Sequence, residues 1–158
     1  MKKLVLTSFA VVALMVAGCS KKEPEVAVQG SLTDAEKLAQ LADQIQGQTQ
    51  NIYFAFDKYN IDANGQAAAN NNAALFNQEG AEALQVKVEG NCDEWGTDEY
   101  NYALGLKRAK AAKDALIAEG VDASRLDVVS YGESNPVCTD RTKSCDAQNR
   151  RSEFKVFY

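Results

Sequence analysis

The sequence predicts an α/β (α+β) fold, a two-layer sandwich of helices on a sheet, and three observations favour it. The chain has 158 residues, enough for one domain of ordinary size but not comfortably for two. Hydrophobic residues make up 46% of the chain and charged residues 25%, close to the average of soluble globular proteins. Segments typical of strands alternate with segments typical of helices, in the order β-α-β-α-β-β.

The predicted sandwich begins at Ile52. Residues 52–56 are apolar on both faces, as expected for a central buried strand. Residues 57–64 supply a turn, and residues 65–79 are helical by composition, although the Ala-Asn run at 67–72 is weak in helix propensity.

The remaining elements follow from periodicity and end signals. Apolar and polar residues alternate over 84–89, which predicts a half-buried strand. Residues 98–119 form the strongest predicted helix, because the segment begins with acidic residues, contains no proline and is followed by a glycine. Two further strands are predicted at 126–131 and 153–158.

One face of the 98–119 helix is rich in small and apolar residues, so we expect it to pack on the sheet. This face consists of Asn101, Leu104, Gly105, Arg108, Ala109, Ala112 and Leu116. Arg108 is the exception, since a buried guanidinium is costly unless it is paired. Either an anionic group meets Arg108, or its stem covers the sheet while its charged end reaches water.

Asp93 follows the second predicted strand, in a loop that leads directly into the helix of Arg108. The crevice beyond the end of such a strand is a common ligand site in open α/β sheets. An arginine can hold a carboxylate through two parallel N–H groups, and an aspartate can hold an ammonium group. Asp93 and Arg108 are therefore candidates for binding a zwitterionic amino-acid group. The alternative is that they pair with each other.

Several segments, in this order and spacing, resemble the OmpA-like peptidoglycan-binding domain. They are Ile52 to Tyr59, Gly90 to Asn101, Leu104, Arg108-Ala109, Tyr131-Gly132-Glu133 and Asn149-Arg150-Arg151. The resemblance covers roughly residues 50–158 and implies a β-α-β-α-β-β sandwich that binds peptidoglycan non-covalently. Cys92 is a departure, because the family often has threonine there.

The resemblance also implies roles for individual residues. Asp93 and Arg108 would hold the diaminopimelate residue of the peptidoglycan stem peptide. The residues implied to complete the pocket are Phe56, Asp57, Thr97, Asn101 and Leu104. Candidates for supporting the site are Gly96, Arg150 and Arg151, of which the two arginines could instead reach the glycan.

The N-terminus has the pattern of a lipoprotein signal peptide. Two lysines and an apolar run precede Val16-Ala17-Gly18-Cys19, which resembles the bacterial lipobox. We predict that residues 1–18 are a signal peptide and that Cys19 is acylated, with palmitate among the expected chains. The alternative is an ordinary signal peptide with an incidental cysteine. A serine follows Cys19, as in the outer-membrane sorting pattern.

Residues 19–50 are predicted to be the lipidated N-terminus and a flexible tether, and residues 51–158 the OmpA-like domain. Within the tether, Leu38, Leu41 and Ile45 fall at helical spacing. This segment is either a short partner-binding helix or a marginal helix within a linker.

Composition excludes several kinds of chemistry. Histidine is absent, which excludes Ser-His-Asp and Cys-His mechanisms.

Cys138 and Cys145 flank a short polar loop and are predicted to form a disulfide in an oxidising compartment, with Cys92 as a lone, partly buried thiol. Three scattered thiols make a poor zinc site, so no metal or cofactor is expected. The net charge of −5 disfavours nucleic acid as a partner.

Together with the lipobox, the whole chain resembles the lipoproteins of the Tol-Pal system. That resemblance implies an outer-membrane lipoprotein whose domain faces the periplasm, binds peptidoglycan and a TolB-like periplasmic protein, and serves envelope integrity and cell division. Two competing classes are an enzyme acting on cell-wall peptides and a module that binds mainly another envelope protein. No base stands beside a nucleophile in the sequence, so we expect a protein that is not an enzyme.

Cys19→Ala is expected to leave an unprocessed precursor without lipid, because the acylated thiol is the signal for cleavage. Mass spectrometry of the membrane fraction measures both the N-terminus and the acyl mass. Wild-type protein cleaved elsewhere and free of acyl mass would contradict the prediction.

Overall fold

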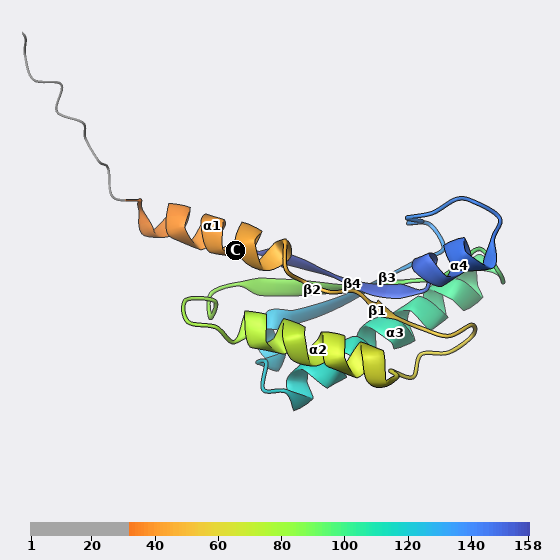
Figure 1. Ribbon diagram of the computed structural model, residues 1–158, viewed down its shortest axis with the longest axis horizontal. Coiled ribbons are helices and arrows are strands. Elements are labelled where there is room, and N and C mark those ends of the chain that lie inside the picture. The colour runs from red at the N-terminus through yellow and green to blue at the C-terminus, as the bar shows by residue number, and fades with distance from the viewer. Residues whose placement is uncertain (1–31) are drawn as a thin grey trace, which may run out of the picture. The chain divides into compact units, whose positions relative to one another are not determined.

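A four-stranded sheet organises residues 32–158, the part of the chain that this computed structural model describes (Figure 1). The predicted signal peptide, Cys19 and the first part of the tether lie outside the described residues. The elements in chain order are α1 (Asp34–Gln46), β1 (Ile52–Tyr53), α2 (Ala63–Phe76), β2 (Gln85–Asn91), α3 (Asp98–Ala118), the 3-10 turn η1 (Ala123–Arg125), β3 (Leu126–Gly132), α4 (Lys143–Asn149) and β4 (Arg151–Phe157).

The strands lie in the order β1-β4-β2-β3. Strands β2 and β3 run parallel, whereas β4 is antiparallel to both β1 and β2. A parallel pair needs a crossover between its strands, and α3 supplies it. Helices α2 and α3 lie on one face of the sheet, which confirms the predicted two-layer α/β sandwich (Figure 1).

The core lies between the sheet and these helices. Val86 and Val88 alternate with polar residues along β2, and both are fully buried, as is Phe154 opposite Val88 on β4. Phe76 of α2 packs on Phe154, with 6.2 Å between the ring centroids. Burial of such side chains is the main favourable term for the fold.

Helix α3 packs closely on β2, and its buried face is the one predicted from its periodicity. Gly90 on the strand meets Gly105 on the helix, and a Cβ added at Gly90 would collide with the Gly105 backbone. This contact of two glycines brings α3 down onto the end of β2. It places Arg108, one turn further along the helix, beside the end of that strand.

Strand β1 differs from its prediction. The apolar run 52–56 was expected to be a central strand, but only Ile52 and Tyr53 pair with β4, at the edge of the sheet. Beyond them Phe54 is buried, whereas Phe56 is 63% exposed. The run is apolar because its first residues contribute to the core and Phe56 contributes to a pocket wall. Periodicity alone does not distinguish this arrangement from a central buried strand.

Helix α1 packs on the domain. Ala42 and Ile45 are buried in the main core, and the compact unit begins at Leu32, ahead of the predicted boundary at residue 51. The Gln46 amide donates to the Phe154 carbonyl (3.0 Å) and accepts from the Val156 N–H (2.8 Å). It thereby covers part of the edge of β4 that the short β1 leaves free. The helical spacing was predicted correctly, but the surface that the helix meets was not.

A short helix, α4, occupies part of the predicted loop between the last two strands. Its N-cap is Thr142, whose hydroxyl accepts from the Cys145 N–H. A disulfide joins Cys138 to Cys145, which is the predicted pairing, and Cys92 is a free, buried thiol. Among residues 32–158, no helix is long and apolar enough to cross a membrane.

Arg125→Met is expected to lower the free energy of unfolding by roughly 3 kcal/mol, because three buried carbonyls lose a charged donor. The Arg125 guanidinium donates to the carbonyls of Leu84 (2.8 Å), Phe76 (2.9 Å) and Ala81 (2.6 Å). Urea unfolding measures the effect, with the exposed Arg141→Met as the matched control. Equal stability of the two variants would contradict the prediction.

Candidate functional site

A pocket of about 250 Å³ opens where β2 ends. The residues that line it are Phe56, Asp57, Asp93, Trp95, Gly96, Tyr100 and Leu104. Five of these were candidates from the sequence, and they come from three segments: the stretch after β1, the loop after β2, and α3. The structure therefore brings together residues that lie far apart in the chain.

Asp93 forms an ion pair with Arg150. Arg150 Nη1 donates to Asp93 Oδ2 over 2.9 Å, and the two side chains are only 14% and 5% exposed. Arg150 Nε also donates to the Phe54 carbonyl (3.0 Å). Asp93 thus does not pair with Arg108, contrary to the alternative left open by the sequence. Its second oxygen, Oδ1, accepts no hydrogen bond within residues 32–158 and is free for a ligand.

Arg108 is fully buried beside this pocket, so its charged end does not reach water. Its guanidinium donates to the backbone carbonyls of Lys58 (2.9 Å), Asn91 (2.9 Å) and Ala55 (3.4 Å) and to Cys92 Sγ (3.4 Å). It also lies over the Phe54 ring, 5.3 Å from the centroid.

Within residues 32–158 no carboxylate forms an ion pair with Arg108. Burial lowers the pKa of the guanidinium from its ordinary value, but arginine stays protonated in proteins. Four hydrogen bonds leave one of its five N–H groups for a further acceptor. The site therefore holds a buried positive charge that favours an anionic ligand group.

Asp57 and Tyr100 form the opposite wall. The Tyr100 hydroxyl donates to Asp57 Oδ1, and this hydrogen bond raises the pKa of Tyr100. Asp57 has a φ of 56°, a left-handed conformation that is uncommon outside glycine and that turns the chain after Phe56. The sequence did not single out Tyr100, because its partner lies 43 residues away.

Three of the candidate residues shape the loop around Asp93. Thr97 caps α3 by accepting from the Tyr100 N–H (3.2 Å), and the fully buried Asn101 amide donates to the Asp93 carbonyl (3.4 Å). Gly96 has a φ of 126°, where side chains are rarely tolerated. Thr97 and Asn101 therefore act on the pocket through the loop, whereas Gly96 also lines it.

Arg151 lies away from this pocket. It is almost fully buried, donates to Glu153 Oε2 (2.8 Å) and lines a different pocket, of about 520 Å³. Because successive strand residues point to opposite faces, Arg151 lies on the face of β4 opposite Ser152 and Phe154. Of the two neighbouring arginines, only Arg150 contacts Asp93.

Cys92 lies beneath the site. Its thiol donates to the Asn101 carbonyl (3.3 Å), and burial raises its pKa to about 11. Within residues 32–158, no three His, Cys, Asp or Glu residues are grouped closely enough to hold a metal ion.

Cys92 is expected to resist alkylation at pH 8, because the thiolate is the reactive form and a raised pKa keeps it scarce until the pH approaches about 11. Labelling with iodoacetamide, followed by mass spectrometry, should be slow in the native protein and fast in urea. Lys110→Cys, exposed on α3, provides the reactive reference. Equally fast labelling of both thiols in the folded protein would refute the prediction.

The sequence and structure are similar to those of known proteins. Residues 53–150 match the model of the OmpA family. The chain is 37% identical over 150 residues to the peptidoglycan-associated lipoprotein of Pasteurella multocida and 39% identical over 150 residues to that of Haemophilus influenzae. Each match covers 95% of this chain and 94% of the relative.

Solved structures support the same grouping. The crystal structure of the peptidoglycan-associated lipoprotein from Burkholderia pseudomallei matches with a TM-score of 0.64 and 35% identity, over 68% of this chain and 90% of that one. The C-terminal domain of Helicobacter pylori MotB matches with a TM-score of 0.62 at 20% identity, over 69% of this chain and 84% of that one, which shows a shared fold alone. Because the relatives match over nearly their whole length, the chain belongs to the OmpA family and, within it, to the peptidoglycan-associated lipoproteins.

Proposed function

We propose that the domain binds peptidoglycan non-covalently through the diaminopimelate residue of the stem peptide, while lipid on Cys19 anchors the protein in the outer membrane. The relatives are named peptidoglycan-associated lipoproteins, which supports the binding of peptidoglycan and the attachment of lipid. The observation that carries it is the pocket between Asp93 and Asp57, which has the buried charge of Arg108 beside it.

The charges of the pocket complement a zwitterionic group. An ammonium group can donate to the free Oδ1 of Asp93 and to the Asp57 carboxylate. A carboxylate is favoured by the Arg108 charge, which no ion pair within residues 32–158 neutralises. Such a charge acts strongly at short range because the surrounding protein excludes water.

The walls of the pocket complement an aliphatic chain. Phe56 is 63% exposed and Leu104 lines the same pocket, so both can cover methylene groups. Diaminopimelate has an amino-acid group at each end of three methylenes. Its free end fits the charged residues, and its chain fits the apolar wall.

The relatives belong to a non-enzymatic family, and the chain is not an enzyme. A pull-down on purified sacculi tests this together with binding: the protein should be retained, and the wall should release no soluble fragments. The resemblance to Tol-Pal lipoproteins further implies a TolB-like partner, a domain facing the periplasm, and a role in envelope integrity and cell division. These finer assignments are part of the proposal.

Asp93→Asn and Phe56→Ala are each expected to weaken retention on sacculi roughly tenfold or more, because one loses the charge that holds an ammonium group and the other a pocket wall. The asparagine keeps an acceptor for Arg150 but loses the charge of the buried ion pair, so Asp93→Asn should melt earlier than the wild type while still folding. Phe56 is exposed, so Phe56→Ala should melt close to the wild type. Co-sedimentation with sacculi and thermal unfolding are measured on the same samples.

Lys110→Ala, at an exposed position outside the buried face of α3, serves as the control and should bind normally. If Asp93 only stabilises the fold through Arg150, the folded fraction of Asp93→Asn will bind sacculi as the wild type does. Normal binding by folded Asp93→Asn and Phe56→Ala proteins would exclude the proposed site.

A further inference from the structure

A second pocket, of about 400 Å³, adjoins the first. It is lined by Phe56, Trp95, Lys143, Asp146 and Arg150. Phe56 and Trp95 line both pockets, so a ligand that occupies the first can continue into the second across these two rings. Trp95 is 58% exposed, and the sequence did not single it out.

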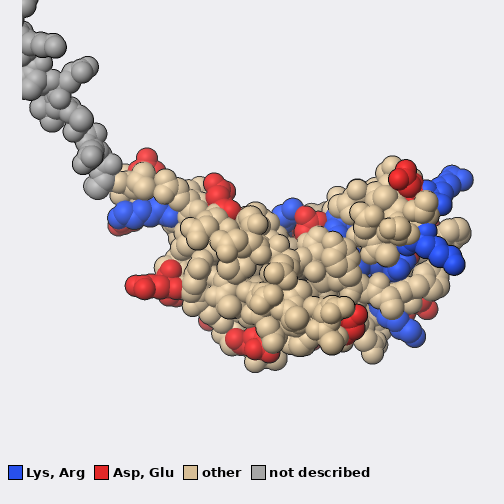
Figure 2. Space-filling view, viewed as in Figure 1, with Lys and Arg blue, Asp and Glu red and all other residues tan. Residues whose placement is uncertain are grey.

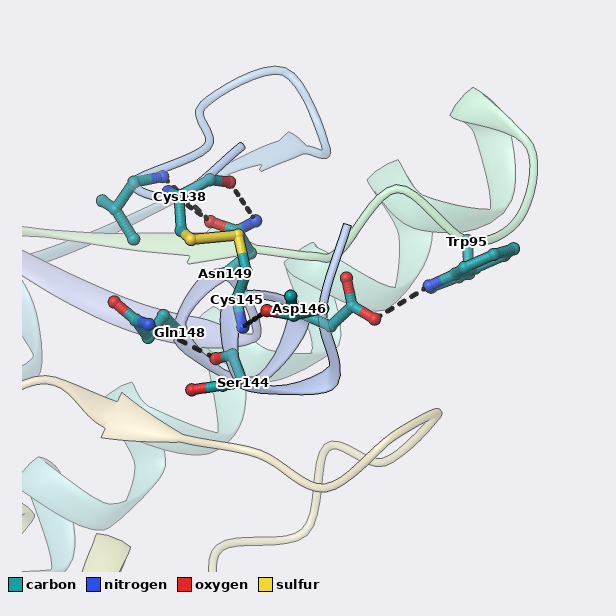
Figure 3. The surroundings of a disulfide bond; sticks show 9 residues. Trp95, Cys138, Ser144, Cys145, Asp146, Gln148 and Asn149 are labelled. Carbon is teal, nitrogen blue, oxygen red and sulfur yellow. Dashed lines mark hydrogen bonds between the residues drawn. A yellow bond between two sulfur atoms is a disulfide. The ribbon is translucent and has the colours of Figure 1, made fainter. Parts of the chain in front are cut away.

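The position of Trp95 is fixed by α4. The indole Nε1 donates to Asp146 Oδ2 over 3.0 Å, and Figure 3 shows this contact reaching from α4 to the loop after β2. The disulfide between Cys138 and Cys145 ties the helix to the preceding loop. Asn149 adds three hydrogen bonds to that loop, to the N–H groups of Val137 and Cys138 and to the Cys138 carbonyl. Trp95 is therefore held as a wall between the pockets.

Two cationic side chains of the second pocket have donors free for an anion. Within residues 32–158, Lys143 makes no ion pair, and Arg150 Nη2 makes no hydrogen bond while Nε and Nη1 are engaged. Asp146 is the carboxylate of the pocket; its Oδ2 accepts from the neutral Trp95 indole, and its negative charge remains beside the two cations. Figure 2 shows basic side chains gathered at the end of the molecule where α4 lies. Two cationic groups thus stand beside two aromatic faces.

We propose that this second pocket is a subsite for the carboxylate of the stem-peptide residue next to diaminopimelate. The inference rests on the proposed function, because diaminopimelate in the first pocket brings its neighbour over Phe56 and Trp95. A γ-linked glutamate precedes diaminopimelate in such peptides and presents a free α-carboxylate beside an aliphatic chain. Lys143 and Arg150 Nη2 bind the carboxylate, and the two rings cover the chain.

The test compares four ligands by calorimetry: meso-diaminopimelate, the tripeptide L-Ala-γ-D-Glu-meso-diaminopimelate, the same tripeptide with its glutamate α-carboxylate amidated, and the muramyl tripeptide. The tripeptide should bind about tenfold more tightly than diaminopimelate. Amidation should remove most of this gain. The chain has a single tryptophan, so a change in intrinsic fluorescence on binding reports on Trp95 alone.

Two variants locate the effect. Lys143→Gln should bind diaminopimelate as the wild type does but lose most of the gain from the tripeptide, and it should bind both forms of the tripeptide alike. Asp146→Ala should red-shift the Trp95 emission, because the indole N–H loses its acceptor. Lys110→Gln, which removes one positive charge from the exposed surface of α3, should keep the gain in affinity for the tripeptide.

Equal affinity of the wild type for the acidic and the amidated tripeptide, or a gain that only the muramyl tripeptide produces, would overturn the subsite while leaving diaminopimelate binding intact. If the wild type binds neither diaminopimelate nor the tripeptide, the proposed function is overturned, and the subsite with it.

Discussion

The arrangement of the site depends on one buried guanidinium. Arg108 joins the segment after β1 to the end of β2 by donating to three backbone carbonyls, those of Ala55, Lys58 and Asn91. It can lie there because Gly90 and Gly105 let α3 approach the strand closely. The cost of burying this charge is offset by charged hydrogen bonds rather than by a carboxylate. The charge is therefore left to act on whatever enters the pocket beside it.

The two arginines near Asp93 have different physical roles. Arg150 pairs with Asp93 and so ties the loop after β2 to the end of α4, while it keeps donors at the border of both pockets. Arg108 is buried beside the first pocket, where it joins the backbone of two segments around the pocket and supplies long-range attraction. The disulfide and Asn149 hold α4 to the preceding loop, and Asp146 of α4 accepts from the Trp95 indole. A binding surface made largely of loops is held in this way by a small number of tertiary contacts.

Periodicity predicted the elements closely wherever a helix or strand buries one face. The buried face of α3 was found residue by residue, because a regular helix repeats its contacts every three to four positions. Most of the pocket residues were identified through the family resemblance. Tyr100 and Trp95 were missed because their partners, Asp57 and Asp146, lie 43 and 51 residues away and leave no local signal. Helix α4 was missed because a segment of seven residues carries too little periodicity.

The sequence by itself determined the α/β class, the order of the main elements, the pairing of Cys138 with Cys145 and the choice of Asp93 and Arg108 as candidate residues. Each of these follows from local spacing or from a motif of neighbouring residues. Only the tertiary structure decided that Asp93 pairs with Arg150, that β1 is an edge strand, and that α1 packs on β4. An apolar or charged face shows that a residue needs a partner, but which partner it meets depends on the three-dimensional path of the whole chain.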